Sequence, residues 1–450
     1  MARSLSARAG SIQMTEGSLY KNILLFSVPL IFSQLLQVMF NMADVAVVGK
    51  FSSATALGSV GSTSTLVTLF TGFLIGLSNG INVRVAQYLG ARQEEDTRNC
   101  VHTALILCTL SGVVIAVLCF FLAAPMLELL KTKDDLLPGA VLYFRIYALG
   151  MPALGIFNFG NAVLSASGDT KRPLAYLTAA GILNVILNLF FVIVCKMAAD
   201  GVALASIISQ YLSAVLVLLH MTHLTDSCRV EWKLLRLHGG EAGRILGLGI
   251  PAGIQGAIFS VSNVFIQSGI NSFGENAIAG SSLALNFEYF TYDIANAFAQ
   301  AAVTFTSQNF GAGDIRRCKR IFRLCLLFGI VFTEILSAVF MVWDDFFVSI
   351  YTSSSAVAVF AVSRMRHVCS LEGLTATYEV ESASLRGMGR SLEPAVFTIL
   401  GTVVFRLIWM ATVFRLFPTY EMLMNVYVAS WVFTGVALFV VYMRHMHRRA

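Results

Sequence analysis

The sequence predicts an all-α polytopic membrane protein with twelve transmembrane helices in two repeats of six. The first observation is composition: 57% of the 450 residues are hydrophobic and 12% are charged. Soluble domains carry about 25% charged residues, so most of this chain meets lipid or the interior of a membrane bundle. The apolar runs are continuous and do not alternate as the strands of a membrane barrel would, which leaves helices as the spanning elements.

The second observation is an internal repeat at a spacing of about 221 residues. Four landmarks recur in order at nearly constant spacing: Pro29 with Pro251, Gly58 with Gly280, Gln87 with Gln308, and Gly168 with Gly389. Two like-ordered halves are a known way to build a central cavity with two alternating openings. The repeat therefore favours a carrier.

The third observation is the length of the apolar runs, because a spanning helix needs about 20 apolar residues. In chain order the predicted spans are 20–46, 56–88, 98–124, 136–167, 172–195, 200–223, 241–271, 278–308, 318–343, 357–388, 393–416 and 422–444. The longest polar connection lies between the sixth and seventh spans. We therefore expect four parts: a cytoplasmic tail at 1–18, an N-lobe at 19–225, a cytoplasmic linker at 226–240 and a C-lobe at 241–450.

Glycine and proline mark the ends and bends of these spans. Pro29 and Pro251 lie inside their spans and should bend them. Gly168, followed by Pro173, should end one helix and start the next. Glycines at 72, 76 and 80 form a small-residue ridge, which predicts close packing against another helix.

Basic residues predict the orientation. Most of the 31 Lys and Arg residues, such as Arg84, Arg98 and Arg317, fall at span ends and loops on one side. This side is expected to be cytoplasmic, which places both termini inside a multi-pass protein of the cell inner (plasma) membrane. The net charge of +6 is explained by this bias, so no nucleic-acid partner is expected. The polar residues 1–18 lack the apolar core of a cleaved signal peptide.

The sequence contains no pattern that indicates an enzyme or an ATP-driven pump. HExxH and Walker A motifs are absent, and the eight cysteines include no C-x-x-C pair. We expect no catalytic residues, no cofactor and no metal site other than one for a sodium ion. The expected partners are membrane lipids and small molecules, and the expected state is a monomer.

Polar residues in register on predicted helices indicate a path for ions or cargo, because charge at the bilayer centre is costly. One face of the first span carries Gln34, Gln37, Asn41 and Asp44. One face of the eighth span carries Tyr289, Asp293, Asn296 and Gln300, and Glu288 lies on the same span at another angle. In the tenth span, Glu379 follows Glu372. Interhelical hydrogen bonding is the structural alternative for each stripe.

The fifth span adds Asn184 and Asn188, one turn apart. These positions and Asp44 align with Phe405, Trp409 and Ile266 in the second half, so the polar cluster is not repeated. Positions shared by both halves supply scaffold, and unshared polar positions are better candidates for function.

The chain resembles the multidrug and toxic compound extrusion (MATE) transporters over residues 18–445. The most specific segments are 41–49 (NMADVAVVG), the Gln-x-x-Gly-Ala sequences at 87–91 and 308–312, and LRGMG at 385–389. The resemblance implies two six-helix lobes forming a V-shaped cavity, and export of organic cations and other drugs in exchange for protons or sodium ions.

The resemblance also implies a cation pocket in the first lobe. Its acid matches Asp44, its Asn-x-x-x-Asp pattern falls on Asn184 and Asn188, and its hydroxyl falls on Ser206. Asn41, on the same face as Asp44, completes the predicted cation-binding set. At Asn188 the family pattern carries Asp, so this pocket offers one carboxylate and two amides. Less charge for sodium favours protons as the coupling ion, with sodium as the alternative.

The function expected from these features is a cation-coupled antiporter that exports organic cations, drugs or other xenobiotics by alternating access. The predicted substrate-binding residues are Gln34, Gln37, Glu288, Tyr289, Asp293, Asn296 and Glu379. The alternative is a flippase for a lipid-linked oligosaccharide. Such flippases have more helices or a strongly basic cavity, whereas the polar stripes here carry mostly acids.

Overall fold

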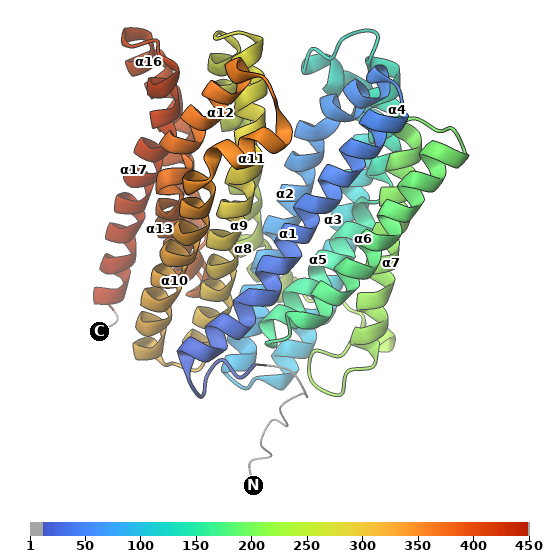
Figure 1. The fold of residues 1–450 in the computed structure, drawn as a ribbon. Coiled ribbons are helices and arrows are strands. Elements are labelled where there is room, and N and C mark those ends of the chain that lie inside the picture. The colour runs from blue at the N-terminus through green and yellow to red at the C-terminus, as the bar shows by residue number, and fades with distance from the viewer. Residues whose placement is uncertain (1–11, 449–450) are drawn as a thin grey trace. The chain divides into compact units, whose positions relative to one another are not determined.

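The computed structural model describes residues 12–448, except for the side chains of Ala54 and of 259–261. Every regular element in residues 12–448 is helical (Figure 1). The predicted tail at 1–18 falls largely outside the described residues. The first half of the chain contains α1 (Leu19–Phe51), α2 (Ala54–Gly90), α3 (Glu94–Leu129), α4 (Leu137–Ala148), α5 (Met151–Ala166), α6 (Lys171–Leu189) and α7 (Ala199–Thr222).

The second half contains ten α-helices, several of them short pieces of one span. They are α8 (Gly239–Asn271), α9 (Glu275–Gly311), α10 (Ile315–Val342), α11 (Asp344–Tyr351), α12 (Ser355–His367), α13 (Thr375–Gly387), α14 (Leu392–Ile399), α15 (Phe405–Ala411), α16 (Val413–Leu416) and α17 (Tyr420–His447). Tighter or wider helical turns join some pieces: a 3-10 turn at Cys369–Leu374 and π-turns at Phe190–Val194 and Leu400–Val404.

The predicted twelve-span layout is confirmed, with three differences in detail. Within residues 12–448 nine helices are long and apolar enough to cross a membrane, or ten when α4 and α5 count as one span. The span predicted at 136–167 is bent by 45° where α4 meets α5. The spans predicted at 278–308 and 357–388 correspond to α9 and to α12 with α13; α9 is not among these apolar helices, and α12 and α13, at 13 residues each, are too short to cross a membrane singly.

The internal repeat is visible in the backbone. Helices α2 and α9 are both 37 residues long, and each is closed by the same hydrogen bond. Ala91 N–H donates to Gln87 O and Ala312 N–H to Gln308 O, both at 2.9 Å. Gly168 and Gly389 both have left-handed φ angles, of +89° and +85°, a conformation that glycine adopts without a steric penalty. Two of the four landmark pairs, Gln87 with Gln308 and Gly168 with Gly389, are therefore structural equivalents.

Contacts divide the chain into two compact units, with boundaries inside helices. Of the described residues, one unit comprises 12–14 and 32–257, and the other comprises 15–31 and 258–448. The boundaries fall within α1 and α8, close to Pro29 and Pro251. The lobes predicted at 19–225 and 241–450 follow the sequence repeat, and that division stays a prediction.

In the unit of residues 32–257, the glycine ridge of α2 packs against α8. A methyl group on Gly76 would overlap the backbone of Gly253, and one on Gly80 would lie 2.6 Å from the carbonyl oxygen of Ile245. Gly72 lies next to Gly256 in the same row. The close packing predicted for this ridge is confirmed, and the first part of α8 is its partner.

Candidate cation and substrate sites

Four of the predicted cation-binding residues meet in one cluster. Asn188 Nδ2 donates hydrogen bonds to Asp44 Oδ1 and, at 3.1 Å, to Asn184 Oδ1. Asn184 Nδ2 in turn donates to Ser206 Oγ at 3.4 Å. The cluster joins α1, α6 and α7, which are far apart in the sequence. We refer to these four residues as the Asp44 cluster.

Local packing explains why these side chains meet. Gly181 of α6 lies against the ring of Phe40 of α1, where a Cβ would collide with the ring. Asp44 follows one turn after Phe40 and Asn188 follows two turns after Gly181, so the close approach of the two helices lies just before the cluster on both of them. A π-turn begins at Phe190, two residues after Asn188. Such turns often occur at functional positions within α-helices.

The Asp44 cluster is enclosed and rich in oxygen. Asn188 is fully buried, Asn184 and Ser206 are buried, and Asp44 is half-buried. Among the described residues, Asn188 Oδ1 is a buried oxygen without a hydrogen-bond partner. A buried unpaired oxygen is costly, and a bound cation would relieve that cost. Oxygen atoms from carboxylate, amide and hydroxyl groups suit a hard cation such as sodium.

The remaining predicted residues of α1 lie outside the cluster. Asn41 and Gln37 are exposed, Gln34 is half-buried, and Gln34 Oε1 has no partner among the described residues. Tyr143 and Tyr147 of α4 were not predicted from the sequence; Tyr143 is buried in one cluster with Val47 and Val48, which follow Asp44 on α1, and Tyr147 packs against that cluster. Their rings stack with centroids 6.0 Å apart. Their spacing of four residues in an apolar span is the signal that could have indicated them.

The polar stripe of α9 has an accessible part and a buried part. Tyr289 is 48% exposed, and Asp293 and Asn296 are half-buried. Further along, Thr304 and Ser307 are buried and donate to backbone carbonyls of their own helix, at 2.9 and 2.6 Å. The part from Tyr289 to Gln300, where the side chains of the stripe are exposed or half-buried, is therefore available for a ligand.

The three acids predicted to bind substrate have different partners. Glu288 is buried and accepts two hydrogen bonds from Arg364 of α12, at 2.5 and 2.8 Å. Glu379 of α13 accepts a hydrogen bond from the hydroxyl of Tyr292 at 2.9 Å. Asp293 makes no hydrogen bond or ion pair with the described part of the chain. A substrate role for Glu288 stays a prediction, and its buried ion pair counts against it.

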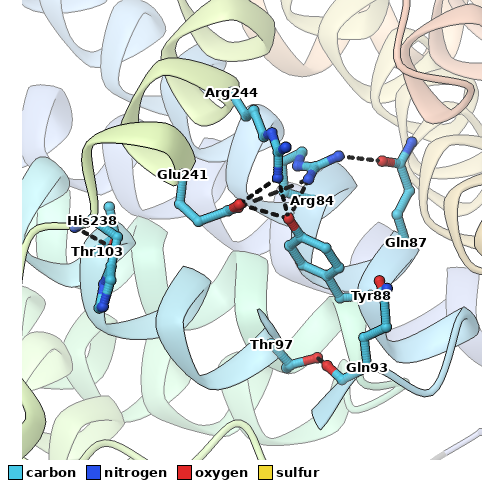
Figure 2. A network of polar contacts seen from close by, with 9 residues as sticks. All are labelled: Arg84, Gln87, Tyr88, Gln93, Thr97, Thr103, His238, Glu241 and Arg244. Carbon is cyan, nitrogen blue, oxygen red and sulfur yellow. Dashed lines mark hydrogen bonds and ion pairs between the residues drawn. The ribbon is translucent and has the colours of Figure 1, made fainter. Parts of the chain in front are cut away.

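A second polar network, missed by the sequence analysis, ties α2 to α8 (Figure 2). Glu241 Oε1 accepts hydrogen bonds from Tyr88 and Arg244, both at 2.7 Å. Arg244 also donates to the Tyr88 hydroxyl at 3.0 Å, and Arg84 donates to the same hydroxyl. Figure 2 shows the four side chains converging around the Tyr88 hydroxyl. All four residues belong to one contact unit, and their hydrogen bonds fix the start of α8 against α2.

The comparison with known families decides the identity. A family model described as MatE matches residues 29–190 and, a second time, residues 251–412. The chain belongs to the MATE family of transporters. The two matches cover more than half of the chain and begin 222 residues apart, so they reproduce the repeat seen in the sequence. The first match contains Asp44, Asn184 and Asn188.

Individual relatives agree with this membership. The probable multidrug resistance protein YpnP of Bacillus subtilis (strain 168) is 30% identical over 67% of this chain and 68% of its own length. The probable multidrug resistance protein NorM of Thermotoga maritima is 21% identical over 86% of this MATE chain and 84% of its own. A solved structure of an outward-facing multidrug resistance MATE transporter has the same fold, with a TM-score of 0.89 over 100% of this chain and 99% of that chain, at 20% identity.

Proposed function

We propose that this MATE transporter is a cation-coupled antiporter that exports organic cations and other drugs by alternating access. The observation that carries the proposal is the Asp44 cluster, which combines a half-buried carboxylate with buried oxygen ligands. A carboxylate that exchanges a cation between the two sides of the membrane can link that cation's gradient to cargo movement. The naming of YpnP and NorM as probable multidrug resistance proteins supports the cargo class.

The proposed cargo site is the accessible stripe of α9 together with α13. Tyr289 offers an exposed ring, Asp293 a carboxylate that has no partner in the described part of the chain, and Glu379 a carboxylate held by one hydroxyl. Aromatic rings and carboxylates together suit flat, lipophilic cations, through cation–π contact and charge pairing. Alternating access would expose this stripe to each side of the membrane in turn.

The proposed coupling ion is the proton. Asp44 is the only carboxylate of the cluster, and Asn188 takes the position where a second acid would add charge for sodium. Asp44 would bind a proton from outside and release it inside while cargo leaves. The chain would work as a monomer in the inner (plasma) membrane, with both termini cytoplasmic.

The test is dye export from liposomes that contain the purified chain, driven first by a pH gradient and then by a sodium gradient. The pH gradient is expected to drive export. Asp44→Asn keeps the side-chain shape but removes the exchangeable charge, so it should abolish gradient-driven export in a folded protein. Asp135→Asn is the matched control, because Asp135 is an exposed loop carboxylate and its loss should leave export unchanged.

Two results would overturn parts of this proposal. Normal export by Asp44→Asn would remove the cluster from the coupling mechanism. Export by the unmodified protein that follows sodium and ignores pH would replace the proton by sodium. Asn188→Asp tests the same point from the other direction, because a second carboxylate should raise the sodium dependence of export at fixed pH.

A further inference from the structure

A basic pocket lies where α1 and α10 begin, away from the Asp44 cluster and the α9 stripe. It has a volume of about 520 Å³ and lies between residues 17–20 and four residues of α10: Arg317, Arg320, Arg323 and Leu324. Figure 1 shows the first turns of these two helices next to each other. Both belong to the same contact unit.

Arg317 builds one wall of this pocket. Its Nη2 donates to the carbonyl oxygens of Glu16 and Gly17, at 3.0 and 3.1 Å, so it holds the chain that leads into α1. The nearby carboxyl groups of Asp314 and Glu16 interact electrostatically with Arg317. Arg317 is therefore already engaged, and its role is to shape the pocket.

Arg320 and Arg323 are the groups available to a ligand. Both are exposed, and among the described residues neither has a carboxylate within ion-pair distance. Arg323 makes one long hydrogen bond, 3.4 Å from its Nε to the carbonyl oxygen of Lys319. Their outer guanidinium nitrogens can therefore donate to an anion, and the fork of N–H groups on each arginine fits phosphate oxygens.

The same face of α10 continues as an apolar stripe. Leu327, Val331 and Ile335 follow Arg323 at helical spacing and are 54%, 41% and 56% exposed. Tyr20, which is 62% exposed, closes the pocket on the α1 side and meets Phe328 edge to face at 6.3 Å. Tyrosine is enriched where lipid headgroups meet the hydrocarbon region. The face thus passes from positive charge through an aromatic ring to lipid-facing aliphatic side chains.

We propose that this pocket binds the headgroup of an anionic phospholipid, whose acyl chain lies along Leu327, Val331 and Ile335. Arg320 and Arg323 hold the phosphate, and Tyr20 marks the level of the headgroup. A free phosphate compound would satisfy the two arginines but would have no use for the apolar stripe. Basic pockets at the ends of membrane helices recognise lipid headgroups in this way.

The test measures lipid binding to the purified full-length chain in detergent by native mass spectrometry. The probes are phosphatidylglycerol and phosphatidylcholine with identical acyl chains, together with glycerol phosphate as the headgroup without a lipid tail. Phosphatidylglycerol should bind more tightly than phosphatidylcholine, and glycerol phosphate should neither bind nor compete. Each basic residue contributes roughly fivefold to such binding, so Arg320→Gln with Arg323→Gln should weaken phosphatidylglycerol binding by about thirtyfold.

Two further variants keep the test decisive. Arg316→Gln removes the same charge from the same helix at an exposed position that does not line the pocket, and it should change binding less than about twofold. Arg320→Lys with Arg323→Lys retains charge and should keep most of the lipid preference if the glutamine variant folds poorly. An equal loss in Arg316→Gln, equal affinity for the two lipids, or displacement of lipid by glycerol phosphate would overturn the proposal.

Discussion

Asp293 and Glu379 are acids on facing helices with different surroundings. Asp293 has no partner among the described residues, whereas Glu379 is bound by the Tyr292 hydroxyl at 2.9 Å. A carboxylate without a protein partner in a membrane segment is a candidate ligand for charged cargo. A carboxylate that also joins two helices contributes to packing as well as offering charge to the cargo.

The first prediction separates these two roles. Asp293→Asn should lower export of cationic dyes at least tenfold more than export of neutral drugs, because only the cationic cargo loses a charge partner worth about 1.4 kcal/mol or more. Transport of a cationic and a neutral compound by the same liposomes is the measurement. Equal impairment of both compounds, together with a lower unfolding temperature, would show that Asp293 braces helices.

Glu379→Gln provides the comparison within the same experiment. The amide can still accept the hydrogen bond from Tyr292, so the protein should stay folded while the negative charge is lost. Tyr292→Phe removes only the hydroxyl, at a stability cost of about 1 kcal/mol. If Glu379 binds cargo through its charge, Glu379→Gln should impair cationic export more than Tyr292→Phe does.

Spacing in the sequence predicted which residues of one helix share a face, and the resemblance indicated which faces meet. Asp44, Asn184, Asn188 and Ser206 do form one cluster. Tyr143 and Tyr147 were missed because proximity to Asp44 depends on how α4 packs, which spacing within a single helix does not encode. Glu288 was predicted to bind cargo because its partner could not be seen from spacing within one helix. That partner, Arg364, lies 76 positions later in the sequence.

At the scale of helices, the close backbone contact between α2 and α8 restricts which residues can stand at the positions where the two helices meet. The second prediction is that Gly76→Ala destabilises the protein by about 1–3 kcal/mol, because its methyl group would overlap the backbone of Gly253. Thermal unfolding in detergent is the measurement. Gly61→Ala in the same helix is the control: nothing lies within 4 Å of its Cβ position, so stability should be unchanged or slightly higher. Equal effects at the two positions would contradict the packing argument.

The third prediction concerns the polar network at the start of α8. Glu241→Gln removes the acceptor charge shared by Tyr88 and two arginines, so unfolding free energy should fall by about 1–3 kcal/mol. Glu393→Gln breaks the exposed pair with Arg390 at 2.6 Å and should cost less than about 1 kcal/mol. Both are measured by thermal unfolding. A cost for Glu241→Gln no larger than that for Glu393→Gln would show that the network contributes little.

Helix positions were predictable from apolar runs, but breaks within helices were not. The span predicted at 136–167 bends by 45° between α4 and α5, where Gly150 and Pro152 disturb the helix. The π-turns at 190–194 and 400–404 carry no glycine or proline signal in common. Each π-turn holds one extra residue, which the neighbouring helices must accommodate. The hydropathy of the sequence does not indicate where such an extra residue lies.

For the whole molecule, the distribution of basic residues gives the fourth prediction. In a cysteine-free background, single cysteines at Lys133 and Glu275 should react with a membrane-impermeant thiol reagent on intact cells. A cysteine at Lys233, in the linker between the predicted lobes, should react only after the cells are opened. All three positions are exposed. Labelling of the Lys233 position on intact cells would reverse the predicted orientation.

The repeat was the part of the whole-molecule organisation that the sequence predicted best. Equivalent landmarks end equivalent helices, as at Gln87 and Gln308. The contact units were not predictable, because their boundaries lie inside α1 and α8 at 31–32 and 257–258. A polar linker shows where the chain leaves the membrane, but it does not show which helices a span packs against.

The low hydropathy of α9 and of α12 with α13 has a consequence for biosynthesis. Segments leave the ribosome one at a time, and the translocation machinery releases each into lipid according to its apolarity. An acid at mid-membrane costs about 2.5–3.5 kcal/mol at that step, and these two segments carry Asp293 and Glu379. Both pack against α10 and against each other. α9 is therefore expected to wait beside the translocation channel until α10 emerges, and the later α12–α13 segment is expected to insert against α10 and α9, so shortening α10 should leave both segments outside the bilayer.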